Sequence, residues 1–175
     1  AIDLTDNPGF NMLMRRHLKK SLSSDVRIEE QQDVEAFMSM TCECLQSRHG
    51  AKPVHTVLEL QQLKDRFPEN IRIFILYSDA DPLAGVCVYV DHTTVHCQYI
   101  STTERGRREN MLPLLFHYLI TDLFCKYRYF DFGTSNEDGG RILNDGLLRQ
   151  KFSLGGTGVA YSKFMIDLSA DRALP

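Results

Sequence analysis

The most constraining feature of this sequence is a single apolar helical stripe with a strand-forming segment on each side. The stripe recurs at the spacing of one helix face and consists of Leu112, Leu115, Phe116, Leu119, Ile120, Leu123 and Phe124. Residues 95–101 before it and residues 127–132 after it are rich in β-branched and aromatic side chains. A strand, a helix and a strand in such close succession predict two parallel strands joined by a right-handed crossover.

The segments around this unit extend the pattern. Residues 95–101 are the last of three consecutive strand-like segments. Only short polar turns separate these segments, so they predict an antiparallel meander. Thr56 and Glu59 have the spacing of a capping box at a helix start. The predicted elements are a strand at 26–28, helices at 33–48 and 56–67, strands at 71–77, 83–90 and 95–101, a helix at 112–124, a strand at 127–132, a helix at 141–150 and a strand at 159–168. The predicted fold is therefore an α/β (α+β) mixed sheet, in the order β-α-α-β-β-β-α-β-α-β, with a central parallel strand pair.

Length and charge limit the classes of protein to consider. With 175 residues, 43% of them hydrophobic, the chain is long enough for one domain with a substantial core. Proteins that bind the phosphate backbone of nucleic acids usually carry an excess of basic residues, whereas this chain has a formal net charge of −3. The longest apolar run is far shorter than a membrane span, so no membrane partner is expected. Five cysteines, an odd number, favour buried reduced thiols and a cytoplasmic location.

The first part of the chain differs in composition from the rest. Residues 10–22 predict a helix with four clustered basic residues: Arg15, Arg16, Lys19 and Lys20. We therefore divide the chain into an N-terminal extension (1–25), a domain (26–170) and a tail (171–175). The basic helix is either a solvated face, a joint to an upstream segment, or a patch for an anionic partner.

The loop after the third meander strand is the predicted ligand site, because ligands collect where parallel strands end and a crossover helix begins. Arg105, Arg107 and Arg108, with Gly106 between them, combine positive charge with backbone access and favour phosphate binding. The alternative is a solvated loop whose arginines pair with Glu104 and Glu109.

The order of elements resembles the GNAT superfamily of N-acyltransferases over roughly residues 26–168. Residues 129–135, the turn at 136–140 and residues 146–152 before Gly155 and Gly156 more specifically resemble the Fem-like branch. That branch includes acyl-CoA enzymes and aminoacyl-tRNA-dependent ligases that build cell-wall cross-bridges. Its members commonly carry two GNAT-like halves. The resemblance implies that this chain matches the second half and that the basic helix corresponds to the connection between halves.

The resemblance also implies a donor site for acetyl-CoA or another acyl-CoA. Tyr99, Ile100 and Ser101 would offer backbone groups to the pantetheine and the thioester. The loop at 105–110 would hold the pyrophosphate through Arg105, Gly106, Arg107, Arg108 and Asn110.

The implied reaction is direct attack of an amine on a thioester or ester, which requires positioning, a base and a donor for the developing oxyanion. The candidate catalytic residues are Glu104, Glu137 and Asp138, with Tyr99 and Ser135 as proton relays. Each has a structural alternative. Glu104 would pair with an arginine, Asp138 would serve a turn, and Ser135 with Asp138 would cap a helix.

Other chemistries find less support in the sequence. No cluster of potential ligands has metal-site spacing, so no metal is predicted. His96 shares a strand with Cys97 and is expected to face the core.

Three functions follow from these observations. The first is an acyl-CoA-dependent N-acyltransferase, with acetyl as the expected acyl group, acting in a ternary complex on a small-molecule or peptide amine. The second is a Fem-like aminoacyl-tRNA-dependent transferase acting on a cell-wall peptide, the one case in which a nucleic acid (tRNA) is a partner. The third is a catalytically inactive GNAT-like half that binds an upstream half or a second copy. It is favoured by Glu109 and Met111, which stand where the family's loop has glycines, and by Arg149, which stands where many members have a tyrosine.

Overall fold

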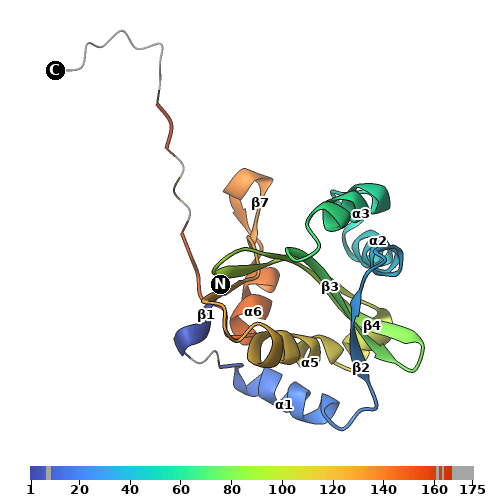
Figure 1. Cartoon of the computed structure of the whole chain (residues 1–175). Coiled ribbons are helices and arrows are strands. Elements are labelled where there is room, and N and C mark those ends of the chain that lie inside the picture. Colours follow the sequence, from blue (N-terminus) through green and yellow to red (C-terminus); the bar gives the residue numbers. More distant parts are fainter. Residues whose placement is uncertain (7–8, 161, 163, 167–175) are drawn as a thin grey trace, which may run out of the picture.

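Six strands form one mixed sheet in the computed structural model, which describes residues 1–6, 9–160, 162 and 164–166 (Figure 1). The strand order across the sheet is β1-β6-β5-β4-β3-β2. The strands are β1 (Ile2–Asp3), β2 (Arg27–Gln31), β3 (Ile71–Ser78), β4 (Asp81–Val90), β5 (Thr94–Thr102) and β6 (Tyr129–Asp131). The predicted mixed α/β fold with a parallel strand pair inside the sheet is confirmed.

The strands β3, β4 and β5 form the predicted antiparallel meander. Ile73 lies opposite Cys87, and Val86 lies opposite Ile100. These strands are apolar along most of their length because helices cover both faces of this part of the sheet. Strand β2 pairs with β3 and forms the edge.

The parallel pair of β5 and β6 is short. The two strands are paired only from Thr94 opposite Tyr129 to His96 opposite Asp131. Strand β6 then ends, whereas β5 continues to Thr102 with β4 as its only partner among the described residues. The sheet therefore opens between these two strands toward their carboxyl ends.

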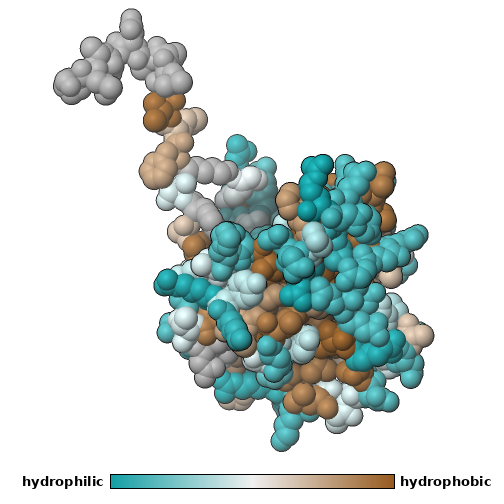
Figure 2. All heavy atoms as spheres, viewed as in Figure 1, coloured by the Kyte–Doolittle hydropathy of each residue, from teal (hydrophilic) through white to brown (hydrophobic). Residues whose placement is uncertain are grey.

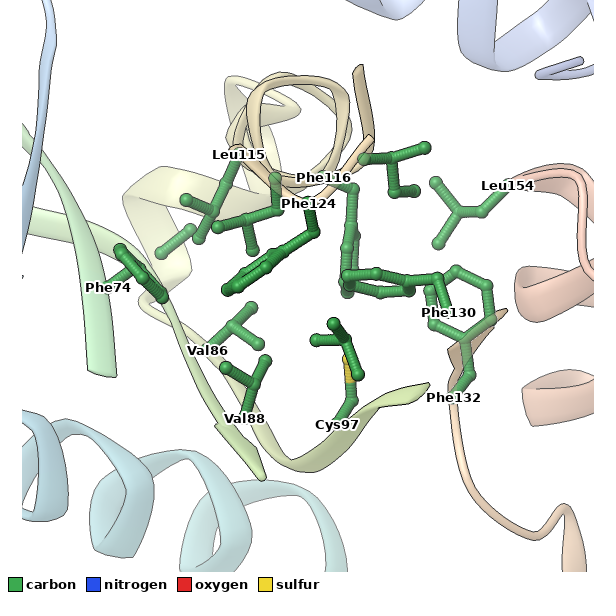
Figure 3. Packing of buried hydrophobic residues seen from close by; sticks show 14 of the residues in the cluster. Phe74, Val86, Val88, Cys97, Leu115, Phe116, Phe124, Phe130, Phe132 and Leu154 are labelled. Atoms are coloured by element: carbon green, nitrogen blue, oxygen red, sulfur yellow. The ribbon is translucent and has the colours of Figure 1, made fainter. Parts of the chain in front are cut away.

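One face of the sheet is covered by α1 (Met12–Ser21) and α5 (Met111–His117), which continues into a π-helical turn, η2 (Tyr118–Leu123). The apolar stripe predicted for this helix is buried here, and its aromatic rings pack edge to face. Phe116, for example, contacts Phe130 and Phe132 with ring centroids 6.0 and 5.2 Å apart (Figure 3). Pro113 lies in the first turn of α5, where a missing amide proton costs little.

The opposite face is covered by α2 (Glu35–His49) and α3 (Val57–Arg66). The capping box predicted at the start of α3 is present: the Glu59 amide donates to Thr56 Oγ1, and the Thr56 amide donates to the Glu59 carboxylate. Phe37 and Met38 of α2 and Leu60 of α3 form a second core cluster with the meander.

The chain after β6 departs from the prediction. Instead of a helix from residue 141, β7 (Asn136–Glu137) and β8 (Ile142–Leu143) form a small hairpin around a turn, η3 (Asp138–Gly140), and α6 (Asp145–Ser153) begins only afterwards. Asn144 sets the start of α6 because its side-chain oxygen accepts from the Leu147 amide at 2.9 Å.

The predicted strand at 159–168 is wrong for its described residues. Residues 159, 160, 162 and 164–166 are not in a strand, and the rest of that segment lies outside the described residues. Residues 164–166, brown and tan in Figure 2, extend away from the domain and are exposed. Strand β1, which the sequence analysis did not predict, lies beside β6 instead.

The first 25 residues form close contacts with the sheet and its core. The side chains of Ile2 and Phe10 are 2% and 7% exposed within the larger core cluster, and the predicted basic helix forms as α1. The division of the chain at residue 25 stays a prediction.

Two further sequence predictions concern the cysteines and the membrane. Cys44, Cys87 and Cys97 are buried free thiols, whereas Cys42 and Cys125 are exposed, contrary to the expectation for these two. Among the described residues, no helix has the length and hydrophobicity needed to cross a bilayer.

Candidate active site

A small cavity lies at the carboxyl end of β5, where the sheet has opened. We call it the strand-end cavity; its volume is about 210 Å³, and it is lined by Met14, His17, Arg48, Thr102, Gly106, Arg107, Asn110, Leu112, Pro113, Gln150 and Leu154. Met14 comes from α1 on one face of the sheet, and Arg48 comes from α2 on the other. Helices from both faces reach one cavity because no β6 backbone separates them at this level.

The loop after β5 folds into a short helix, α4 (Glu104–Arg108), which packs closely on β4. A Cβ atom on Gly106 would lie 1.9 Å from the Leu83 carbonyl oxygen, so this position requires glycine for packing. The Gly106 amide donates to Thr103 Oγ1 at 3.0 Å. Gly106 therefore lines the cavity, but its amide is already engaged by the helix cap.

The three predicted phosphate-binding arginines point to different places. Arg105 donates to Glu109 and Asp81, both at 2.9 Å. Its pairing with Glu109 is what the alternative interpretation, a solvated loop with paired arginines, predicted. Arg107 lines the strand-end cavity and donates from one guanidinium nitrogen to the Thr102 carbonyl at 3.0 Å. Arg108 is exposed and does not line the cavity.

The other predicted donor residues lie on or near the open edge of β5. The Tyr99 hydroxyl is 2.7 Å from His55 Nδ1, and Ser101 Oγ donates to Thr41 Oγ1 at 2.8 Å. The Ile100 side chain packs against the larger core cluster. These side chains are engaged, but the backbone edge of residues 97–102 that faces away from β4 pairs with no described strand. Asn110, in a left-handed conformation before α5, lines the cavity.

A second, larger cavity lies beyond the end of β6. We call it the hairpin cavity because β7 and β8 form one of its walls; its volume is about 890 Å³. It is lined by Ala1, His96, Asp131, Gly133, Thr134, Ser135, Asn136, Gly139, Gly140, Leu143, Leu148, Lys151, Phe152, Thr157, Gly158, Val159 and Ala160.

A histidine and an aspartate from the parallel pair face this cavity together. His96 Nδ1 lies 2.7 Å from Asp131 Oδ2, and the two side chains are 38% and 19% exposed. The hydrogen bond with His96 holds the pKa of Asp131 below its ordinary value, and the Gly133 amide, donating at 3.0 Å, adds to this effect. The expectation that His96 faces the core was wrong. Its neighbours Val95 and Cys97 are buried, and strand alternation places His96 on the opposite side.

Lys151 of α6 is the charged group that sequence analysis did not select. Its side chain lines the hairpin cavity, although the residue is only 8% exposed. The ammonium group donates to the Gly133 carbonyl at 3.0 Å and to the Thr134 carbonyl, and burial lowers its pKa. The sequence signal that could have pointed to Lys151 was its position in the segment at 146–152, which carries the resemblance to the Fem-like branch.

The predicted proton relay Ser135 lines the hairpin cavity, whereas the three catalytic candidates, Glu104, Glu137 and Asp138, line neither of the two cavities. Glu137 is exposed on β7 and accepts from the Asn144 side chain at 2.7 Å. Asp138 is exposed with a φ of 48°, and its carboxylate lies 3.7 Å from the Arg141 guanidinium. Its place in the turn η3 agrees with the structural alternative, in which Asp138 serves a turn. Glu104 is exposed in the first turn of α4.

Helix α6 lies between the two cavities. Gln150 and Leu154 line the strand-end cavity, whereas Leu148, Lys151 and Phe152 line the hairpin cavity. Helix α6 therefore contributes residues to the walls of both cavities. Within the described part of the chain, no three His, Cys, Asp or Glu side chains are grouped to hold a metal ion.

Comparison with known proteins gives a consistent result. A family model described as an acetyltransferase (GNAT) domain matches residues 13–138, more than two thirds of the chain. No curated protein matches the sequence significantly.

Several solved structures share the fold. The structure of a possible acetyltransferase from Clostridium difficile 630 has a TM-score of 0.62 at 12% identity, covering 82% of this chain and 97% of that one. FemX has a TM-score of 0.65 at 10% identity; the match covers 87% of this chain and 54% of FemX. An aminoglycoside acetyltransferase from an uncultured soil metagenomic sample, in complex with sisomicin, has a TM-score of 0.54 at 11% identity, covering 82% and 97%.

Proposed function

Because the chain belongs to the acetyltransferase (GNAT) family, we propose that it transfers an acyl group from an acyl-CoA thioester to an amine. The observation that carries this proposal is the opening of the sheet after His96, where the strand-end cavity receives residues from both faces. Parallel strands that separate leave an unpaired backbone edge, which offers hydrogen bonds to a slender amide-bearing arm such as pantetheine.

The chemistry of the strand-end cavity fits an anionic donor. Its charged lining residues are Arg48 and Arg107, together with the titratable His17, and no carboxylate of the described residues lines it. Acyl-CoA carries its negative charge on the phosphates at one end and its thioester at the other. With the phosphates in the strand-end cavity, the open edge of β5 leads the thioester back toward His96.

The hairpin cavity fits the acceptor. An amine arrives protonated at neutral pH and must lose a proton before it attacks. His96, oriented by Asp131, is placed to accept that proton from the amine nitrogen. The nitrogen then bonds to the thioester carbonyl carbon, the carbon–sulfur bond breaks, and the CoA thiolate leaves with the second proton that the nitrogen loses as the amide forms.

Lys151 is placed to stabilise the oxygen that becomes negative during this attack. Its ammonium group has three protons, two of which go to the Gly133 and Thr134 carbonyls. The third is available to an oxyanion in the hairpin cavity, where partial burial strengthens the interaction.

Two measurements test the function. Calorimetric titration with acetyl-CoA should give saturable binding, and incubation with acetyl-CoA and a panel of amines, aminoglycosides and peptides included, should release free CoA and yield an acylated product. His96→Ala should lower kcat about hundredfold or more while acetyl-CoA binding is retained. The matched control is His92→Ala, at an exposed turn residue before β5 that lines neither cavity. Absence of binding heat at millimolar acetyl-CoA would overturn the acyl-CoA assignment.

An aminoacyl-tRNA donor is the second candidate, supported by the exposed basic side chains of α1 and by the Fem-like resemblance. Arg15, Arg16, Lys19 and Lys20 are all exposed on that helix. Salt-sensitive retention of tRNA, reduced by charge removal at these four positions, would support this candidate. If neither donor binds, the inactive GNAT-like half, paired with an upstream half or a second copy, becomes the better account.

A further inference from the structure

The β7–β8 hairpin presents one large apolar side chain to the hairpin cavity and turns another away from it. Asn136 lies opposite Leu143 in the hairpin, and both residues line the cavity. The next pair, Glu137 and Ile142, belongs to the other face of the hairpin and does not line the cavity. Leu143 is 50% exposed. The hairpin, which projects from the sheet (Figure 1), therefore holds an apolar side chain at the cavity with much of its surface uncovered.

Helix α6 adds further apolar side chains to the same cavity. Leu148, Lys151 and Phe152 have the spacing of one helix face, and all three line the cavity. Leu147, one position earlier, does not line it. Phe152 is 47% exposed, although Lys151 beside it is buried. We call Leu143, Leu148 and Phe152 the apolar wall. Large apolar side chains left half-exposed in a cavity with a few polar groups are typical of a ligand site.

The charges in the hairpin cavity match an acceptor with one amine and no second positive charge. Asp131 is the only carboxylate among the described residues that line the cavity, and it is already paired with His96. The two acidic residues of the hairpin, Glu137 and Asp138, lie outside the lining. The Lys151 ammonium lies within it and would repel a second cation, the more strongly because the site is partly buried.

We propose that the hairpin cavity takes a monoamine whose amino group is carried by an apolar or aromatic body. The proposal rests on the proposed function, because it names the substrate class of the acceptor in that reaction. The amine nitrogen lies toward His96, and the body covers the apolar wall. A cavity volume of about 890 Å³ admits a body much larger than an ethyl group. Covering the exposed surface of Leu143 and Phe152 removes apolar area from water, which favours binding of the larger amine.

The first test compares amines that differ in one feature. Release of free CoA at saturating acetyl-CoA gives kcat/KM for ethylamine, hexylamine and 1,6-diaminohexane. Hexylamine should exceed ethylamine about tenfold or more, because its additional methylene groups contact the apolar wall. The diamine has the same chain with a second ammonium at its far end, so its kcat/KM per amino group should be about tenfold below that of hexylamine. Equal values for hexylamine and the diamine would overturn the inference.

The second test changes the apolar wall. Leu143→Ala and Phe152→Ala should each lower the ratio of kcat/KM for hexylamine to that for ethylamine about fivefold or more. Phe152→Leu keeps an apolar contact and should retain most of the ratio. The matched controls are Ile142→Ala and Leu147→Ala, whose side chains adjoin the wall residues in sequence but do not line the cavity, and they should leave the ratio unchanged. An unchanged ratio in both wall variants, or an equal fall in the controls, would overturn the inference.

Calorimetric titration with hexylamine in the absence of acetyl-CoA separates this inference from the proposed function. Thermal unfolding first establishes that each variant is folded. Hexylamine binding that Phe152→Ala weakens, without acyl transfer to any amine, would overturn the proposed function and leave the apolar amine site standing. Acyl transfer to ethylamine and 1,6-diaminohexane without preference for hexylamine would overturn the inference and leave the proposed function intact. Absence of both binding and transfer would overturn both.

Discussion

The two sides of β5 differ in almost every respect. On the β4 side, hydrogen bonding continues along nearly the whole strand, the neighbouring strands are apolar, and helices cover both faces. On the β6 side, pairing stops at His96, and the cavity beyond is lined by basic, amide and hydroxyl groups together with four apolar residues, Met14, Leu112, Pro113 and Leu154. The closed side supplies stability, and the open side leaves polar groups to be satisfied by ligands. Substitutions on the two sides should therefore separate stability from binding.

The largest expected loss of stability is on the closed side. Phe37 is fully buried between α2 and the meander. Phe37→Ala should lower the free energy of unfolding by about 3–5 kcal/mol, measured by urea denaturation, because it leaves a cavity that the core cannot fill. Leu58→Ala, at a position 66% exposed on α3, should change it by no more than about 0.5 kcal/mol. Similar effects for the two variants would contradict the placement of the second core.

The next prediction concerns the boundary between the two sides. Gly106→Ala places a methyl group against the Leu83 carbonyl, so α4 must move away from β4. We expect a loss of about 1–3 kcal/mol in unfolding free energy and weaker CoA binding, since Arg107 moves with the helix. Gly146→Ala in α6, where the nearest heavy atom is 3.5 Å from the added carbon, is the control and should be close to neutral. A stable Gly106→Ala with unchanged CoA affinity would contradict the close packing.

On the open side, an activity loss should exceed the stability loss. Lys151→Met removes the donor to the Gly133 and Thr134 carbonyls. The free energy of unfolding should fall by about 1–2 kcal/mol, because solvent in the hairpin cavity can replace part of these bonds. The kcat for acyl transfer should fall about hundredfold, measured at saturating acetyl-CoA. Full activity in this variant would remove Lys151 from the reaction.

The smallest effect is a pH dependence from Asp131. Because its hydrogen bond with His96 lowers the pKa of Asp131 in the folded state, the pair contributes stability above the ordinary aspartate pKa. That contribution is lost as the pH falls through the lowered value. The difference in unfolding free energy between wild type and Asp131→Asn should shrink between pH 6 and pH 2, by less than about 1 kcal/mol, since the pair is partly exposed. A difference that grows toward acid pH would contradict this sign.

The closed side was largely predictable from the sequence, and the open side was not. The meander, the stripe of α5 and the capping box at Thr56 depend on local periodicity and short connections, which the sequence displays directly. Even the parallel pair followed from the connection between its strands. Strand alternation around Cys97 would also have placed His96 correctly.

The remaining site features depend on tertiary contacts. The position of Lys151 is set by carbonyls that follow β6, and the glycine at 106 is required by a β4 carbonyl. Helix α6 begins after its cap residue, Asn144. The sequence alone did not show whether the helix would begin there or directly after the two preceding glycines. Arg105 was predicted to hold phosphate because of its place in the loop, but one of the two carboxylates that it binds, Asp81, comes from the start of β4 and is distant in sequence.

The most direct test of the account is a map of backbone amide chemical shifts during titration with acetyl-CoA. We expect the changes to concentrate at residues 97–112 and 150–154 and on α1 around His17, with the β3 and β4 amides distant from that edge nearly unmoved. Changes confined to α2 and α3, or no changes at millimolar acetyl-CoA, would contradict a donor site where β5 and β6 separate.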